Sequence, residues 1–103
     1  MEPAEARRVA RTVLDGIASA DVPLRLVDDA DVADLGWARV YAWNTERWFA
    51  TRDRSDAAGP GPGPVVVPAD GEAFLLASTP SYDEQLAAYA RDHGLPPPPP
   101  LGW

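Results

Sequence analysis

The chain has 103 residues, the length of a single domain, and carries sixteen acidic residues against nine basic ones for a net charge of −7. All nine basic residues are arginines. So acidic a chain is a poor nucleic-acid binder, because phosphate binding needs basic side chains that displace counterions. The sequence has no cysteine and one histidine, which excludes a disulfide framework, a thiolate nucleophile and a histidine-based metal cluster.

No apolar stretch of the sequence approaches the roughly 18 residues that a membrane span needs. The first residues also lack the basic-then-apolar order of a secretory signal peptide. We therefore expect a cytoplasmic protein that has no membrane partner.

The first predicted element is an amphipathic helix over residues 3–20. Val9, Val13 and Ile17 recur every four residues and so fall on one face of a helix. A short strand is predicted over residues 24–27, where leucine and arginine alternate.

An acidic connector follows this strand and contains Asp28, Asp29, Asp31 and Asp34. Carboxylates this close together repel one another. We therefore expect residues 28–34 to form a solvated loop.

Residues 37–43 are predicted to form the central strand, because tryptophan, tyrosine and valine favour strands. Alternation along a strand places four of these residues on one face: Trp37, Arg39, Tyr41 and Trp43. The next stretch, residues 45–51, fits either a short strand or one helical turn.

Residues 52–64 are predicted to be a loop, because alternating glycine and proline prevents both helix formation and strand pairing. A hairpin is expected after it, with strands at 65–67 and 72–77. The turn between them would be formed by Asp70 and Gly71, a residue pair typical of tight hairpins.

The last predicted helix begins after Ser81, a candidate cap that Glu84 completes as a capping box. Gly94 is a natural terminator for this helix. Beyond it, residues 95–103 form a polyproline tail for which the sequence implies no partner in the core.

This order of elements predicts an α+β fold. We expect an antiparallel sheet of three to four strands, with the N-terminal and the C-terminal helix packed on one face. Residues 1–94 would form the single domain and residues 95–103 a separate tail.

Catalytic and metal sites are not expected. His93 falls in the last turn of a helix, where a histidine stabilises the negative end of the helix dipole. The acidic connector lacks the glycine and the distal glutamate of a calcium loop. We therefore predict no catalytic residue, no metal and no cofactor, and an enzyme that uses paired carboxylates is the weakest of the alternatives.

A protein-binding surface is the stronger hypothesis. Clustered acidic residues steer encounters with a basic partner, and tryptophan, tyrosine and arginine concentrate at interface hot spots. Arginine is also unsuited to a dry core without a carboxylate partner. The candidate partner-binding residues are Asp28, Asp29, Asp31, Asp34, Arg39, Trp43 and Trp48.

The stretch from the central strand to the last helix resembles the immunity protein 35 family, also described as YrhB-like. Three segments carry the resemblance: the Gly-Trp strand at 36–41, the Gly-Pro and aliphatic strand with its Gly-Glu return at 63–72, and the Thr-Pro before an apolar and acidic helix at 79–86. The resemblance covers residues 5–93. Arg39, the Gly-Pro repeat and the polyproline tail depart from the family pattern.

The resemblance implies a bacterial immunity protein that binds a cognate toxin of a polymorphic toxin system in the cytoplasm and blocks it without catalysis. A basic, nuclease-like toxin would suit so acidic an inhibitor. The alternative is a general peptide- or client-binding, chaperone-like module that uses the proline-rich tail as a docking segment.

Overall fold

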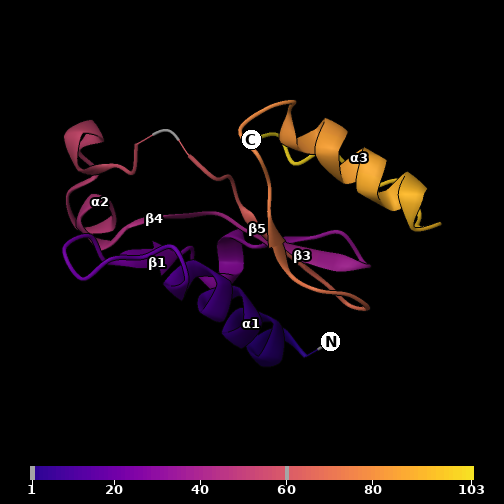
Figure 1. Ribbon diagram of the computed structural model, residues 1–103, viewed down its shortest axis with the longest axis horizontal. Helices are drawn as coiled ribbons and strands as arrows, with labels where there is room; N and C mark the ends of the chain where they lie inside the picture. The colour runs from indigo at the N-terminus through magenta and orange to yellow at the C-terminus, as the bar shows by residue number, and fades with distance from the viewer. Residues whose placement is uncertain (1, 60) are drawn as a thin grey trace.

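An antiparallel sheet forms the centre of the computed structural model, which describes residues 2–59 and 61–103 (Figure 1). Its strand order is β2-β3-β5-β6. The strands are β2 (Ala33–Asp34), β3 (Ala38–Tyr41), β5 (Val65–Pro68) and β6 (Phe74–Leu75). β3 and β5 pair at the middle of the sheet, with Val40 opposite Val66.

Helices cover both faces of this sheet (Figure 1). Helix α1 (Pro3–Asp15) packs with one buried cluster, which includes Tyr41, Val65 and Val67. Helix α3 (Tyr82–Asp92) packs with the other, which includes Ala38, Val40 and Val66. Residues that alternate along β3 and β5 therefore face different helices.

The α+β class and the antiparallel sheet are confirmed, but the expected packing of both helices on one face is wrong. Every residue of β5 is buried, and β3 is buried at Ala38, Val40 and Tyr41. A strand that is apolar on both faces needs cover on both. The unbroken valine run of β5 was the sequence signal for this arrangement.

Helix α1 is shorter than predicted, because it ends at Asp15 with Gly16 as its cap. Its buried residues are Ala6, Ala10 and Leu14. Val9 and Val13 are only partly buried beside them, and Ile17 lies beyond the helix with 39% of its surface exposed. Alanine in the contact stripe brings α1 close to the sheet.

The predicted central strand is interrupted at Ala42. The part after the break, β4 (Trp43–Thr45), pairs with β1 (Leu24–Leu26) in a separate two-stranded sheet. Before the break, Trp37 does not lie on the face that alternation along the strand predicts for it. Trp37 packs on the α3 side of the sheet, with its ring stacked on Tyr89 at 5.6 Å. The expectation that Trp37 shares a face with Tyr41 is therefore wrong.

Helix α2 (Glu46–Thr51) resolves the ambiguity that the sequence left open after β4. Thr45 caps it by accepting a hydrogen bond from the Trp48 backbone N–H at 3.0 Å. The Thr45 hydroxyl also donates to the backbone carbonyl of Asp56, in a 3-10 turn of the following loop at Arg54–Asp56. This buried threonine therefore joins α2 to the loop.

The acidic connector is more ordered than a solvated loop. It forms a 3-10 turn at Asp29–Asp31 and then β2, in which Asp34 pairs with Arg39 of β3. Arginines from other elements pair with three of its carboxylates: Arg25 with Asp28, Arg7 with Asp29, and Arg39 with Asp34.

The hairpin of β5 and β6 is confirmed, although its loop spans residues 69–73 and is longer than a two-residue turn. The start of α3 also follows the prediction, since the Ser81 side chain accepts from the Glu84 backbone N–H at 3.2 Å. Gly94 takes a positive φ of 66°, as expected of a helix terminator.

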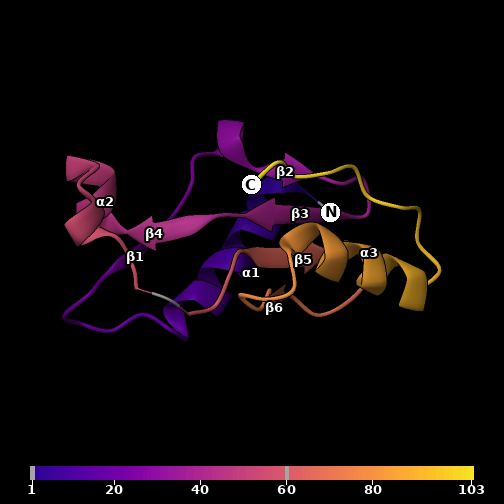
Figure 2. The same ribbon diagram turned by 90° about the horizontal axis from the view of Figure 1, so that it is seen from above.

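The polyproline tail turns back along α3 (Figure 2). The Trp37 indole N–H donates to the Pro96 carbonyl oxygen at 3.1 Å. The Leu101 backbone N–H donates to an Asp83 carboxylate oxygen at 2.8 Å, and the Leu101 side chain packs against the cluster under α3. The tail thus has the core partner that the sequence did not imply.

Among the described residues, no helix combines the length and the apolar character that crossing a membrane requires.

Candidate functional site

Helix α2 lies at one end of the elongated molecule (Figure 1) and carries an aromatic pair, Trp48 and Phe49. The rings of Trp48 and Phe49 meet edge to face, with centroids 5.1 Å apart. Both side chains are only partly buried. The Arg52 guanidinium lies over the two rings, at 4.4 Å from the Trp48 centroid and 5.3 Å from that of Phe49.

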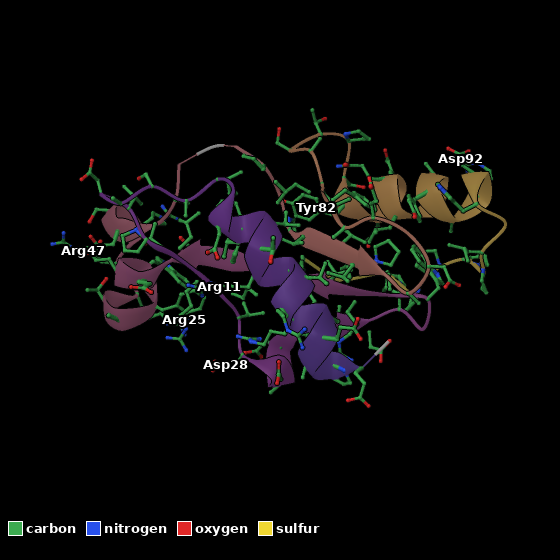
Figure 3. The ribbon with its side chains drawn as sticks, turned by 60° about the horizontal axis from the view of Figure 1, so that its bottom comes forward. Arg11, Arg25, Asp28, Arg47, Tyr82 and Asp92 are labelled. Atoms are coloured by element: carbon green, nitrogen blue, oxygen red, sulfur yellow. The ribbon has the colours of Figure 1, made fainter. Side chains whose placement is uncertain are left out.

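A second arginine links this pair to the acidic connector. The Arg25 guanidinium, on β1, lies 5.0 Å from the Phe49 centroid. The same side chain forms an ion pair with Asp28 at 3.1 Å, and Figure 3 shows the two residues as neighbours. We call these five residues the Arg25–Trp48 surface: Arg25, Asp28, Trp48, Phe49 and Arg52.

The chemistry of this surface suits protein recognition. Partly exposed aromatic rings offer a large contact area, and arginines stacked on them lose little further freedom when a partner binds. Tryptophan and arginine are also enriched among the residues that dominate interface energies. Contacts among these side chains therefore already fix their positions.

The other connector carboxylates pair with arginines away from α2. Asp29 forms an ion pair with Arg7 of α1 at 3.0 Å. Asp34 lies 3.6 Å from Arg39 and accepts a hydrogen bond from the Gly36 backbone N–H. Asp31 is exposed. The connector is thus acidic in sequence, but arginines offset much of its charge in the fold.

Arg39 and Trp43, also predicted to bind a partner, lie apart from Trp48. The Arg39 side chain is 21% exposed, and its Nε atom is buried. The Trp43 indole N–H donates to the Gly63 carbonyl oxygen at 2.8 Å. Trp43 also lines a hollow of about 320 Å³ together with Tyr82 and Trp103.

Close packing beside this hollow explains one glycine of the Gly-Pro loop. A Cβ atom on Gly63 would come within 2.7 Å of the Tyr82 ring and 3.1 Å of the Leu76 carbonyl oxygen. Gly63 is buried, and its carbonyl holds the Trp43 indole. This end of the loop is therefore part of the packed structure and not only a spacer.

Asp53 and His93 both lie at the ends of helical elements. Hydrogen bonds from the Ser55 backbone and hydroxyl lower the pKa of the exposed Asp53 carboxyl, as expected of a cap on a 3-10 turn. His93 is exposed, with Nδ1 2.9 Å from the Tyr89 carbonyl oxygen and its ring stacked on Tyr89. Within residues 2–59 and 61–103, no three His, Cys, Asp or Glu side chains are grouped to hold a metal ion.

A known protein family matches most of this chain. The family model for immunity protein 35 matches residues 4–92, which run from the start of α1 to the end of α3. The chain belongs to the immunity protein 35 family. No curated protein and no solved structure matches it. The resemblance noted in the sequence is thereby confirmed, and the polyproline tail lies outside the matched residues.

Sequence reasoning missed three members of the Arg25–Trp48 surface, namely Arg25, Phe49 and Arg52. Arg25 is the exposed residue between two buried leucines of β1, with Asp28 three positions later. That alternation was a usable signal. Arg52 offered no such signal, because its place over Trp48 depends on a left-handed backbone turn after α2.

Proposed function

We propose that this protein is a bacterial immunity protein that binds a cognate toxin in the cytoplasm and neutralises it by occlusion, without catalysis. Membership of the immunity protein 35 family supports the toxin as partner. The observation that supports occlusion is the Arg25–Trp48 surface, a partly exposed cluster of aromatic rings and arginines at one end of the fold.

In this proposal Trp48 and Phe49 anchor the toxin. Arg25 and Arg52 hold the two rings in place and add charge-assisted contacts at the edge of the interface. Arg39 and Trp43 remain secondary candidates, because their side chains are already engaged within the domain. The account predicts that one aromatic residue dominates the affinity.

The acidic connector would raise the rate at which this protein associates with a basic toxin. Arginines pair with Asp28, Asp29 and Asp34, but Asp31 is exposed and the whole protein still carries a net charge of −7. A basic toxin would be steered toward such a surface, so the association rate would fall as salt is added.

The anchoring role is tested by calorimetry with the cognate toxin, which the proposal expects a neighbouring gene to encode. Trp48→Ala should weaken binding by about tenfold or more, as is typical of a hot-spot tryptophan. Trp103→Ala is the matched control, since Trp103 is an exposed tryptophan outside the Arg25–Trp48 surface. Equal affinity for the wild type and Trp48→Ala would rule out Trp48 as the anchor of the interface.

The steering role is tested by changing all four connector aspartates to asparagine and measuring the association rate at low salt. The rate should fall. A control variant with Glu2, Glu5, Asp70 and Glu72 changed to their amides has the same net charge and should retain most of the rate. Unchanged association by the connector variant would contradict steering by these residues.

A further inference from the structure

We propose that a groove on the other side of α2 receives a lysine or arginine side chain of the toxin. This inference rests on the proposed function and specifies the chemistry of the contact. The groove has a volume of about 820 Å³ and lies between the loop before β1, α2 and the loop after α2. We call it the α2 groove, and Asp21, Val22, Glu46, Arg47, Ala50 and Ala57 line it.

Hydrogen bonds fix both walls of the α2 groove. On one side, the Glu46 backbone N–H donates to the Pro23 carbonyl oxygen at 3.0 Å, which holds the loop before β1 against α2. On the other side, the Thr45 hydroxyl donates to the Asp56 carbonyl, and Thr51 donates to the Asp56 carboxylate at 2.7 Å. The groove is therefore built by the fold, and a ligand would not have to assemble it.

The lining of the groove is partly apolar. Val22 has 48% of its surface exposed, which makes it one of the few large exposed hydrophobic residues among those described. Pro23, Ala50, Ala57 and Ala58 add further apolar surface. Such a lining suits the aliphatic part of a long side chain.

The rim of the groove carries uncompensated negative charge. Asp56 is paired with Arg47 at 3.2 Å, and Arg47 is itself 81% exposed. Asp21 and Glu46 have no basic partner within 4.0 Å in the part of the chain that the structure describes. A cation that enters the groove would therefore meet two carboxylates that no arginine of this chain neutralises.

The apolar lining and the unpaired carboxylates together favour a lysine or arginine side chain as the occupant of the α2 groove. Lysine and arginine combine an aliphatic stem with a terminal cation, so the stem can lie on Val22 and Ala50 while the cation reaches the carboxylates. An acidic side chain would be repelled, and a purely apolar one would leave the carboxylates unused. The basic occupant also agrees with the net charge of −7.

With both the α2 groove and the Arg25–Trp48 surface occupied, one toxin would contact α2 on two opposite sides. Trp48 and Phe49 project toward Arg25 and Arg52, whereas Glu46, Arg47 and Ala50 line the groove. A short helix held between two contacts of different chemistry would give specificity as well as affinity, because a competitor would have to satisfy both.

The inference is tested first without the toxin, by titrating the ¹⁵N-labelled protein with the peptide acetyl-Leu-Arg-Leu-amide. Amide signals of residues 21–22, 46–50 and 55–59 should shift and saturate. Acetyl-Leu-Gln-Leu-amide, which lacks the charge, should cause much smaller shifts. The variant Asp21→Asn with Glu46→Gln should bind the arginine peptide about tenfold more weakly, because two exposed charge contacts are lost. The control variant Asp70→Asn with Glu72→Gln should behave as the wild type does.

Shifts that fall elsewhere, or that are equal for both peptides, would overturn the groove as a basic side-chain site. The same paired variants are then measured against the toxin of the neighbouring gene, where the groove variant should lose about tenfold in affinity. Toxin binding that is unaffected by the groove variant would overturn the groove and leave the immunity function standing. Peptide binding in the groove with no toxin binding by the wild type would refute the immunity function instead.

Discussion

The guanidinium of Arg52 lies 4.4 Å from the centroid of the Trp48 ring, and Arg52 itself has a left-handed backbone with φ of 56°. Its backbone N–H donates to the Trp48 carbonyl oxygen at 2.6 Å. A residue other than glycine in this conformation costs about 1–2 kcal/mol. The turn that ends α2 is therefore also the turn that places the guanidinium over the aromatic pair.

Arg52→Gly and Arg52→Ala separate the backbone role of Arg52 from its side-chain role. Glycine adopts the left-handed conformation freely, so the glycine variant should be about 1 kcal/mol more stable than the alanine variant in urea unfolding. Both variants should bind the toxin more weakly, because both lose the cation over Trp48. Wild-type affinity in the glycine variant would show that the guanidinium has no part in the interface.

The polyproline tail should contribute to the stability of the domain. Leu101→Ala removes part of a half-buried side chain from the cluster under α3, and the free energy of unfolding should fall by about 1–2 kcal/mol. Pro99→Ala, at an exposed position of the same tail, is the control and should change stability much less. An unchanged urea midpoint in Leu101→Ala would mean that the tail does not hold its place on α3 in solution.

The same contacts change how a tail deletion must be interpreted. Loss of residues 95–103 would remove Leu101 from the core and free the Trp37 indole from Pro96. Weaker toxin protection by the truncated protein could then arise from instability alone. The unfolding free energy of the truncated chain therefore has to be measured before its binding is compared.

Tyr41 provides a test of the packing on the α1 side of the sheet. Its side chain is fully buried, and its hydroxyl has no hydrogen-bond partner among the described residues. Because an unpaired buried hydroxyl is costly, Tyr41→Phe should leave stability unchanged or raise it by up to about 1 kcal/mol. Leu14→Ala, in the same cluster, should cost about 2–5 kcal/mol. A clear loss of stability in Tyr41→Phe would reveal a partner for the hydroxyl.

Asp53 should make one part of the stability depend on pH. Hydrogen bonds from Ser55 lower the pKa of the Asp53 carboxyl in the folded protein below its ordinary value of 3.8. The ionised Asp53 carboxylate therefore stabilises the folded protein fully at pH values well above 3.8. This contribution is lost as the pH falls through the lowered pKa of the folded state. The stability difference between the wild type and Asp53→Asn should stay constant above about pH 5 and shrink as the pH falls below about 4.

The matched variant Asp70→Asn corrects this comparison for the change in net charge, because Asp70 is exposed in the hairpin loop. After that correction, a difference that stays constant across the pH range would contradict the assignment of the cap to the ionised Asp53.

Local signals in the sequence predicted most of the elements. The helix start at Ser81, the terminator Gly94 and the valine strand β5 follow from capping, backbone freedom and β-branching, which act over a few residues. What the sequence did not predict depends on contacts between distant segments. The break at Ala42 lets β4 pair with β1, and the tail position depends on Trp37 and Asp83.

The candidate site was predictable only in part. Trp48 and Asp28 were selected by residue type, and the structure connects them through Arg25 and Phe49. The charge of the connector could not be judged from its sequence, because Arg7 and Arg39 reach it from other elements. The α2 groove had no local signal at all, since its walls come from the loop before β1, α2 and the loop after α2.

In the proposed function this chain acts by covering a toxin with the surface around α2. The most direct measurement is hydrogen exchange of the ¹⁵N-labelled protein with and without the toxin of the neighbouring gene. The account predicts protection that is concentrated at Arg25 and at residues 46–52, together with loss of toxin activity at a one-to-one ratio. Toxin neutralised without protection there, or toxin consumed by catalytic amounts of this protein, would contradict it.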